Sequence, residues 1–237
     1  FETLKELDML MAYESPELEG IPEAYIDKDH MYTGTKVITT GIAYNTEIVK
    51  TAPASFADLT TEAYKDNLIM PSPLYSGAAA YNLGVITRTE GMGWEYYEAL
   101  KANGITVDKG NGAVQNAIVA GDKGCGLLAD YMAIRSKNDG APVEFVYPAE
   151  GSPAVTEPIG IVNTTDTPEL AEAFVDFVLS EEGQTLTSEI GYTPVKSGVA
   201  VPEGLKGIDE IELMTWDTEE LYQNRDADKD QFTQLFQ

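Results

Sequence analysis

The chain of 237 residues has one cysteine, one histidine and few basic residues, and each shortage argues against a class of function. A lone Cys125 cannot form a disulfide within the chain, and a lone His30 cannot supply a zinc site or a histidine-based triad. Lys and Arg number 15 against 40 Asp and Glu, so the net charge is -25. Because such a surface repels polyanions, nucleic acid and anionic membranes are not expected as partners.

Long apolar runs and the usual catalytic motifs are also absent. No apolar run approaches the roughly 18 residues that a membrane span needs. No G-x-S-x-G elbow, Walker loop, H-E-x-x-H or C-x-x-C pair occurs. Acid–base chemistry would have to come from carboxylates or tyrosines, so an enzyme is not supported. A hydrolase using a pair such as Asp130 and Glu150 is the enzymatic alternative, and we expect no catalytic residue, metal or cofactor.

Hydrophobic residues make up 43% of the chain, which is enough material for packed cores. Short apolar runs alternate with amphipathic segments, as is typical of an α/β fold with mostly parallel sheets and flanking helices. Clusters of proline and glycine near residues 148–153 and 202–207 predict turns, and the acidic stretch 203–230 predicts a solvated face. The expected strands are Thr35 to Thr40, Leu68 to Met70, Cys125 to Ala129, Val143 to Tyr147 and Ile159 to Val162.

Helix boundaries are indicated by capping residues. One helix should start near Gly91 and end at Asn103-Gly104, and another should start at Gly112 and end at Gly121. A third is expected to begin after Thr167 as N-cap, and a fourth after Ser180. The third is expected to bury Leu170, Phe174 and Phe177.

The first residues predict a helix without a cap. Apolar residues recur at helical spacing from Phe1 to Met11, and no N-cap residue precedes them. We therefore expect the natural polypeptide to extend upstream of this helix.

The strongest local signal for binding runs from Met70 to Tyr81, where a strand end is followed by a proline-stiffened loop and small residues. Ser76 can cap the next helix, whose start would present the unpaired N–H groups of Gly77, Ala78 and Ala79. These groups and the positive end of the helix dipole attract phosphate, phosphonate or carboxylate without any arginine. The alternative, which the local pattern alone favours, is an ordinary cap with alanines packed under a sheet.

Two further segments have the same character. Asn111 can cap a helix that begins at Gly112, and this start could converge with the first on one cleft. Tyr131 follows the strand expected at Cys125 to Ala129, at its carboxyl end, where open α/β sheets bind ligands. Its hydroxyl could bond an oxyanion or coordinate a hard metal. The alternatives are an ordinary cap at Asn111 and a half-buried aromatic at Tyr131.

Several short motifs occur in a characteristic order. They include Phe1-Glu2-Thr3-Leu4-Lys5, Gly41-Ile42-Ala43-Tyr44-Asn45-Thr46, Met70-Pro71-Ser72-Pro73, Gly93-Trp94-Glu95-Tyr96-Tyr97, Val119-Ala120-Gly121-Asp122, Leu179-Ser180-Glu181-Glu182-Gly183-Gln184 and Gly191-Tyr192-Thr193-Pro194-Val195. Each motif alone is weak, but their order from Phe1 to about Pro202 resembles the extracellular solute-binding proteins of ABC importers. The similar branch contains ferric-ion, phosphonate and sugar-phosphate binders.

The resemblance implies a two-lobed α/β protein with a hinge, like type II periplasmic binding proteins. Residues 1–43 and 155–237 would form one lobe, and residues 46–152 the other. The first lobe would be incomplete, because family members begin with a strand–helix–strand portion before the point that matches Phe1. The implied ligand-binding positions are Ser72, Ser76, Gly77, Ala78, Asn111, Gly112, Ala113 and Tyr131.

The function that the resemblance implies is capture of a small anionic solute in a cleft between the lobes and its transfer to an ABC permease in the membrane. A phosphonate or a sugar phosphate would suit the implied positions. Iron-binding relatives usually carry two adjacent tyrosines where this chain has Tyr131-Met132, so a ferric-iron receptor is the alternative. Ala78 stands where many relatives have threonine. The protein is expected to be an extracellular monomer, either a cell-surface lipoprotein or periplasmic.

Overall fold

The computed structural model describes residues 1–237 and divides them into two compact units. Unit 1 comprises Phe1–Ile38 and Thr156–Glu210, and unit 2 comprises Thr39–Val155 and Ile211–Gln237. The units differ from the predicted lobes at residues 39–43 and, more extensively, at the end of the chain, where residues 211–237 join unit 2. The reason is the last helix, α8 (Thr218–Phe236), which packs against α2 (Gly77–Arg88) of unit 2.

Unit 2 is built around a mixed sheet. Parallel pairing joins β3 to both β4 and β5, whereas β2 pairs antiparallel with β5 and β6. The α/β class is therefore as predicted, but the sheet is mixed rather than mostly parallel. Its strands are β2 (Thr33–Asn45, which starts in unit 1), β3 (Leu68–Pro71), β4 (Thr106–Asp108), β5 (Cys125–Ala129), β6 (Val143–Val146) and β10 (Leu213–Met214), which pairs with β7 (Ser152–Ile159).

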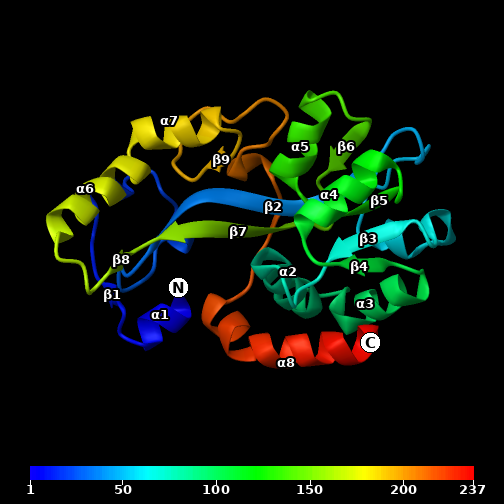
Figure 1. Ribbon diagram of the computed structural model, residues 1–237, viewed down its shortest axis with the longest axis horizontal. Helices are drawn as coiled ribbons and strands as arrows, with labels where there is room; N and C mark the ends of the chain where they lie inside the picture. Colours follow the sequence, from blue (N-terminus) through cyan, green and yellow to red (C-terminus); the bar gives the residue numbers. More distant parts are fainter. The chain divides into compact units, whose positions relative to one another are not determined.

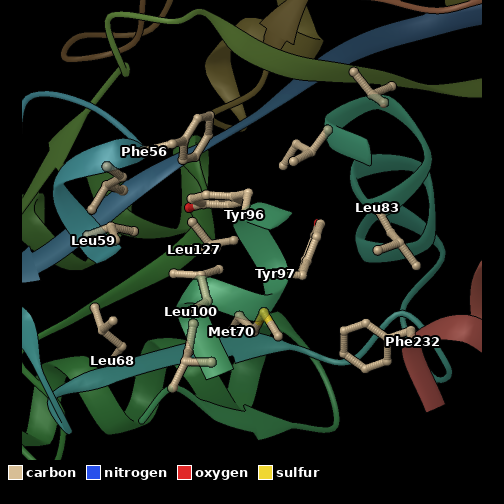
Figure 2. Packing of buried hydrophobic residues seen from close by; sticks show 14 of the residues in the cluster. Phe56, Leu59, Leu68, Met70, Leu83, Tyr96, Tyr97, Leu100, Leu127 and Phe232 are labelled. Carbon is tan, nitrogen blue, oxygen red and sulfur yellow. The ribbon is translucent and has the colours of Figure 1, made fainter. Parts of the chain in front are cut away.

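Helices cover both faces of this sheet. Neighbouring residues of a strand point to opposite faces, so they pack against different helices. Met70 of β3 belongs to a larger core with α2, α3 (Gly93–Ala102) and α8, which Figure 2 shows from close by. Its neighbour Ile69 belongs to a smaller core with α4 (Asn111–Ala120) and α5 (Asp130–Asn138). Figure 1 shows these two helix groups on opposite sides of β3 and β5.

The buried strands of unit 2 follow the prediction closely. β5 has the predicted bounds, and Cys125 within it is fully buried, as expected of a small apolar filler. Burial raises the pKa of its thiol to about 12. Helix α4 ends at Gly121, whose φ of 80° is the left-handed conformation that the glycine there predicted.

Unit 1 has little regular sheet. Its strands β1 (Leu10–Met11) and β8 (Ile161–Val162) form a two-stranded antiparallel pair, and β9 (Thr193–Pro194) pairs with the start of β2. Helices α6 (Pro168–Leu179) and α7 (Glu181–Glu189) pack on each other. The fully buried Gln184 of α7 ties the unit together, donating to the carbonyls of Thr35 and Val178 and accepting from the amide of Val195.

Three sequence predictions fail in unit 1. The opening helix α1 covers only Glu2–Glu6, because Asp8 takes a φ of 53° and the chain then enters β1. The strand expected from Ile159 to Val162 is two strands, β7 and β8, interrupted at Gly160. Helix α6 buries Val175 and Leu179 and leaves exposed the residues predicted to be buried. Their exposed fractions are 70% for Leu170, 60% for Phe174 and 42% for Phe177.

Two further predictions are confirmed. The chain turns at residues 148–151, where the amide of Gly151 donates to the carbonyl of Pro148, and β7 begins directly after this turn at Ser152. Nine of the ten acidic residues in the stretch 203–230 are exposed, as expected of a solvated face, and Asp228 alone is buried. On its other side α8 buries the apolar residues Leu221 and Phe232. None of the helices combines the length and the apolar content needed to cross a bilayer.

Candidate anion-binding site

The carboxyl ends of three neighbouring strands in unit 2 lie at one edge of the sheet. β4, β3 and β5 run parallel, with Pro71 opposite Asp108 and Leu68 opposite Cys125. Each of these strands is followed by a helix, which is α4, α2 and α5 respectively. All three helices therefore begin at the same edge, which we call the helix-start edge. This places the two predicted anion segments, after β3 and after β4, side by side.

The start of α2 matches the predicted capping geometry. Ser76 is the N-cap, and its hydroxyl oxygen accepts a bond of 3.2 Å from the amide of Ala79. The amide of Ala79 is thus not free, contrary to the prediction. The amides of Gly77 and Ala78 have no acceptor within the protein, and Gly77 is exposed. These two donors and the positive helix end can receive an anion.

The start of α4 differs from the prediction by one residue. The N-cap is Gly110, in an extended conformation, and Asn111 is the first helical residue, with no side-chain capping bond. The carbonyl of Gly110 accepts from the amides of Ala113 and Val114. The amides of Asn111 and Gly112 have no acceptor, and the Asn111 side chain is released from the capping role that we had assigned to it. Two further backbone donors without an acceptor therefore lie at the same edge.

Glycine at three positions of the helix-start edge is not required by the fold. A side-chain carbon added to Gly77, Gly110 or Gly112 would meet no atom within 4 Å, and none of the three has a left-handed φ. By contrast, a carbon added to Gly126 of β5 would lie 2.2 Å from the carbonyl oxygen of Ile69. The edge glycines leave open space next to backbone donors without acceptors, which suits close approach of a ligand.

Tyr131 lies in the first turn of α5, at the predicted strand end. The residue is half-buried, and the Arg135 guanidinium lies 5.5 Å from the centre of its ring. Gln115 of α4 donates to the carbonyl of Met132, so α4 and α5 are neighbours. Because β4 and β5 run parallel in one sheet, the helix starts that follow them place Tyr131 and Asn111 at the same edge.

Asp130, the first residue of α5, is buried among uncharged donors. Its carboxylate accepts a bond of 2.6 Å from the Thr39 hydroxyl, one of 2.8 Å from the Tyr131 amide and one of 3.4 Å from the Tyr147 hydroxyl. Desolvation outweighs these bonds and raises the pKa of Asp130 to about 6. Glu150, suggested as its acidic partner, instead accepts from the amides of Phe56 and Ala57. The carboxylates of Asp130 and Glu150 therefore accept hydrogen bonds from different groups.

Ser72 has an internal role in this structure. It is buried, and its hydroxyl oxygen accepts from the amide of Leu74 within the loop that leads to α2. Its own amide donates to the carbonyl of Asp108, which links the ends of β3 and β4. The side chain therefore shapes the loop that carries Ser76.

Two cations at or near the helix-start edge were not assigned from the sequence. Lys109 is exposed in the short connection between β4 and α4, and Arg135 lies one turn after Tyr131 on α5. Arg135 could have been found in the sequence from its spacing of four residues after Tyr131, which places the two side chains on the same side of a helix. The structure contains no group of three or more His, Cys, Asp or Glu side chains suited to hold a metal ion.

Comparison with known proteins agrees with this architecture. Residues 1–224 match the family described as bacterial extracellular solute-binding protein. A protein of Salmonella typhimurium named "Putative 2-aminoethylphosphonate-binding periplasmic protein" is 26% identical over 205 residues, which cover 81% of this chain and 58% of that protein. The chain spans somewhat more than half of the curated relatives it matches, 57% and 58% for two of them.

Solved structures share the fold over nearly the whole chain. The periplasmic binding protein AfuA of Actinobacillus pleuropneumoniae, with fructose-6-phosphate bound, superposes with a TM-score of 0.85 at 23% identity over 98% of this chain and 77% of that one. The apo ferric ion-binding protein A of Pasteurella haemolytica gives 0.83 at 19% identity over 99% and 78%. At these identities the likeness establishes the periplasmic-binding-protein fold.

Proposed function

Because the chain belongs to the bacterial extracellular solute-binding protein family, we propose that it acts in an ABC importer as the substrate-binding component. In this proposal the helix-start edge of unit 2 captures a small anionic solute, which is then delivered to the permease. The supporting observation is the set of amides without acceptors at Gly77, Ala78, Asn111 and Gly112, all at one edge of one sheet. Four such donors and two helix dipoles favour a compact anion.

The solute class that we propose is a phosphonate or a sugar phosphate. The named Salmonella relative and the AfuA complex concern solutes of these two kinds. Both carry a tetrahedral group whose oxygens can each accept a backbone N–H, and the open space at Gly77 and Gly112 leaves room for it. The nearby Lys109 adds local positive charge to a chain with a net charge of -25.

Ferric iron is the second candidate, supported by the fold shared with ferric-binding proteins and by Tyr131 at the same edge. Iron held by a tyrosinate would give a visible charge-transfer band when ferric citrate is added. A spectrum that stays flat while phosphonate binds would favour the organic anion.

Binding rather than catalysis is the activity that we propose. A carboxylate hydrolase would need two carboxylates that face one substrate, and Asp130 and Glu150 are held by different partners. Capture requires no covalent step.

Calorimetric titration of the chain tests the proposal. The probes are 2-aminoethylphosphonate, fructose-6-phosphate, inorganic phosphate and ferric citrate. We expect the first or second to bind, and Ser76→Ala to weaken that binding about tenfold through loss of an oriented hydroxyl and of helix-start order. No heat with any of the four probes would overturn the proposal.

Ser180→Ala is the matched control. Ser180 caps α7 in unit 1 with the same geometry, its hydroxyl oxygen accepting at 3.1 Å from the amide of Gly183. Both substitutions should lower stability by about 1 kcal/mol, but only Ser76→Ala should weaken binding. Equal effects of the two variants on affinity would place the site elsewhere.

A further inference from the structure

Helix α8 lies closely against α2, the helix whose first turn carries Ser76 and Gly77. A side-chain carbon added to Gly84 of α2 would lie 2.8 Å from Leu221 of α8, so glycine permits the close approach. At the end of α2, the two terminal nitrogens of the Arg88 guanidinium donate to the two carboxylate oxygens of Asp228 of α8, at 2.8 Å and 3.3 Å. Both side chains of this pair are largely buried. The contact fixes where α8 lies along α2.

From this position α8 places Phe232 in the wall of a cavity that Pro71 and Pro73 of the loop before α2 also line. Phe232 is 2% exposed, and its ring packs edge-on to Tyr97 with centroids 6.2 Å apart. In Figure 2 it enters the larger core from α8, at the side of Leu83 and Met70. This cavity has a volume of about 10 Å³, roughly the space of one water molecule. The other lining residues are Met70, Pro71, Pro73, Ala79, Asn82, Leu83, Tyr97 and Leu127.

The loop before α2 is held from inside by the buried Pro71, Ser72 and Pro73. Its Leu74 and Tyr75 side chains are exposed, at 36% and 73%, whereas Pro71 and Pro73 face the cavity. Ala79, whose amide is bonded to Ser76, lies on the same cavity wall. The support under this part of the helix-start edge therefore includes the ring of Phe232.

The cavity also contains an unsatisfied polar group. Asn82 is 6% exposed and donates from its side-chain nitrogen to the Thr40 hydroxyl at 2.9 Å. Its side-chain oxygen is buried and has no hydrogen-bond partner. The cavity wall therefore carries one polar atom whose desolvation no hydrogen bond offsets, so the stability of this wall depends on the packing of its apolar neighbours.

We propose that α8, through Phe232, is a positioning element for the anion site: it holds the Pro71–Ser76 loop and the first turn of α2 in the geometry that presents the amides of Gly77 and Ala78. The inference rests on the proposed function. Phe232 lies beyond residues 1–224, which match the family, so this support comes from outside the matched region.

Two Phe→Leu variants in the same core test the inference. Phe232→Leu removes the ring from the cavity wall, and Phe56→Leu makes the same change in a fully buried residue that does not line the cavity. Figure 2 shows the two rings at opposite ends of the cluster. Both variants should lower the melting temperature to a similar extent. Only Phe232→Leu should weaken 2-aminoethylphosphonate or fructose-6-phosphate binding, about tenfold.

Amide hydrogen exchange gives a readout that needs no ligand. In Phe232→Leu, exchange at Ala79 and Ala80, which bond to Ser76, should rise about tenfold, while Phe56→Leu leaves these amides unchanged. Equal exchange and equal affinity in the two variants would overturn the positioning role. If the unsubstituted chain binds none of the four probes, the proposed function fails, and the exchange comparison still decides whether Phe232 orders the helix start.

Discussion

Helices α2 and α6 are both 12 residues long, yet they are buried to very different extents. α2 lies between the sheet of unit 2 and α8, and buries six residues. α6 in unit 1 buries only Val175 and Leu179 and leaves its stripe of Leu170, Phe174 and Phe177 exposed. An apolar stripe thus indicates which face of a helix can be buried. Whether that face is buried depends on a second layer elsewhere in the chain.

The largest effect expected from this contrast is on core stability. Leu83→Ala in α2 removes a side chain that is 1% exposed, and should lower the free energy of unfolding by about 2–5 kcal/mol. Phe174→Ala in α6 removes a larger side chain that is 60% exposed, and should change it by no more than about 0.5 kcal/mol. Urea unfolding of both variants measures the difference. A large loss for Phe174→Ala would mean that its face is covered in solution.

The burial of the Asp130 carboxyl in unit 2 should make the stability of the protein depend on pH. Burial raises the pKa of Asp130 to about 6 from 3.8, so the folded chain holds this proton more tightly than the unfolded chain. The resulting stability is complete below pH about 4 and falls as the pH rises to about 6, by on the order of 3 kcal/mol. Urea unfolding from pH 4 to 7 should show this slope in the unsubstituted chain relative to Asp130→Asn. Parallel pH profiles would contradict it.

Two glycines of α2 should respond in opposite directions. Gly84→Ala places a carbon 2.8 Å from Leu221 and should cost about 1 kcal/mol through overpacking against α8. Gly77→Ala meets open space and should stabilise the helix by about 0.5 kcal/mol, while weakening anion binding because the added methyl occupies the approach to the amide. Thermal unfolding and calorimetric titration separate the two effects. Unchanged affinity in Gly77→Ala would exclude that amide from the site.

The smallest expected difference concerns the helix caps. Ser76 accepts a capping bond at the start of α2, whereas Thr167 at the start of α6 makes no side-chain capping bond. Ser76→Ala should therefore lower the free energy of unfolding by about 1 kcal/mol, and Thr167→Ala by less than about 0.5 kcal/mol. Chemical denaturation is accurate enough to distinguish them if several midpoints are averaged. Equal losses would mean that Thr167 caps α6 in solution.

Parts of the fold and of the site could be predicted because their causes are local. The bounds of β5 follow from a short apolar run, and Ser76 caps α2 by bonding an amide three residues away. The end of α4 follows from a glycine that can adopt a positive φ. That the α2 and α4 starts could converge was also expected, but β4, the short strand that places the α4 start beside the α2 start, was not among the expected strands.

Other predictions failed where a neighbouring residue or a distant segment overrides the local pattern. Asn111 was expected to cap α4, but the extended backbone of Gly110 already places its carbonyl at the helix start. The opening helix was expected to continue beyond Glu6, but Leu10 and Met11 are taken up by pairing with β8, far along the chain. Helix α6 shows the opposite case: its apolar pattern is present in the sequence, but no second layer covers that face.

Caps, turns and single strands in this chain could be predicted from the sequence, because each depends on residues only a few positions apart. The layering of helices on the sheet of unit 2 could not be predicted, because its free energy comes from contacts between remote segments. The ion pair of Arg88 with Asp228 joins residues 140 positions apart and brings an acidic helix back over α2. No periodicity near Asp228 indicates that partner, so the packing of α8 against α2 is decided by the tertiary structure alone.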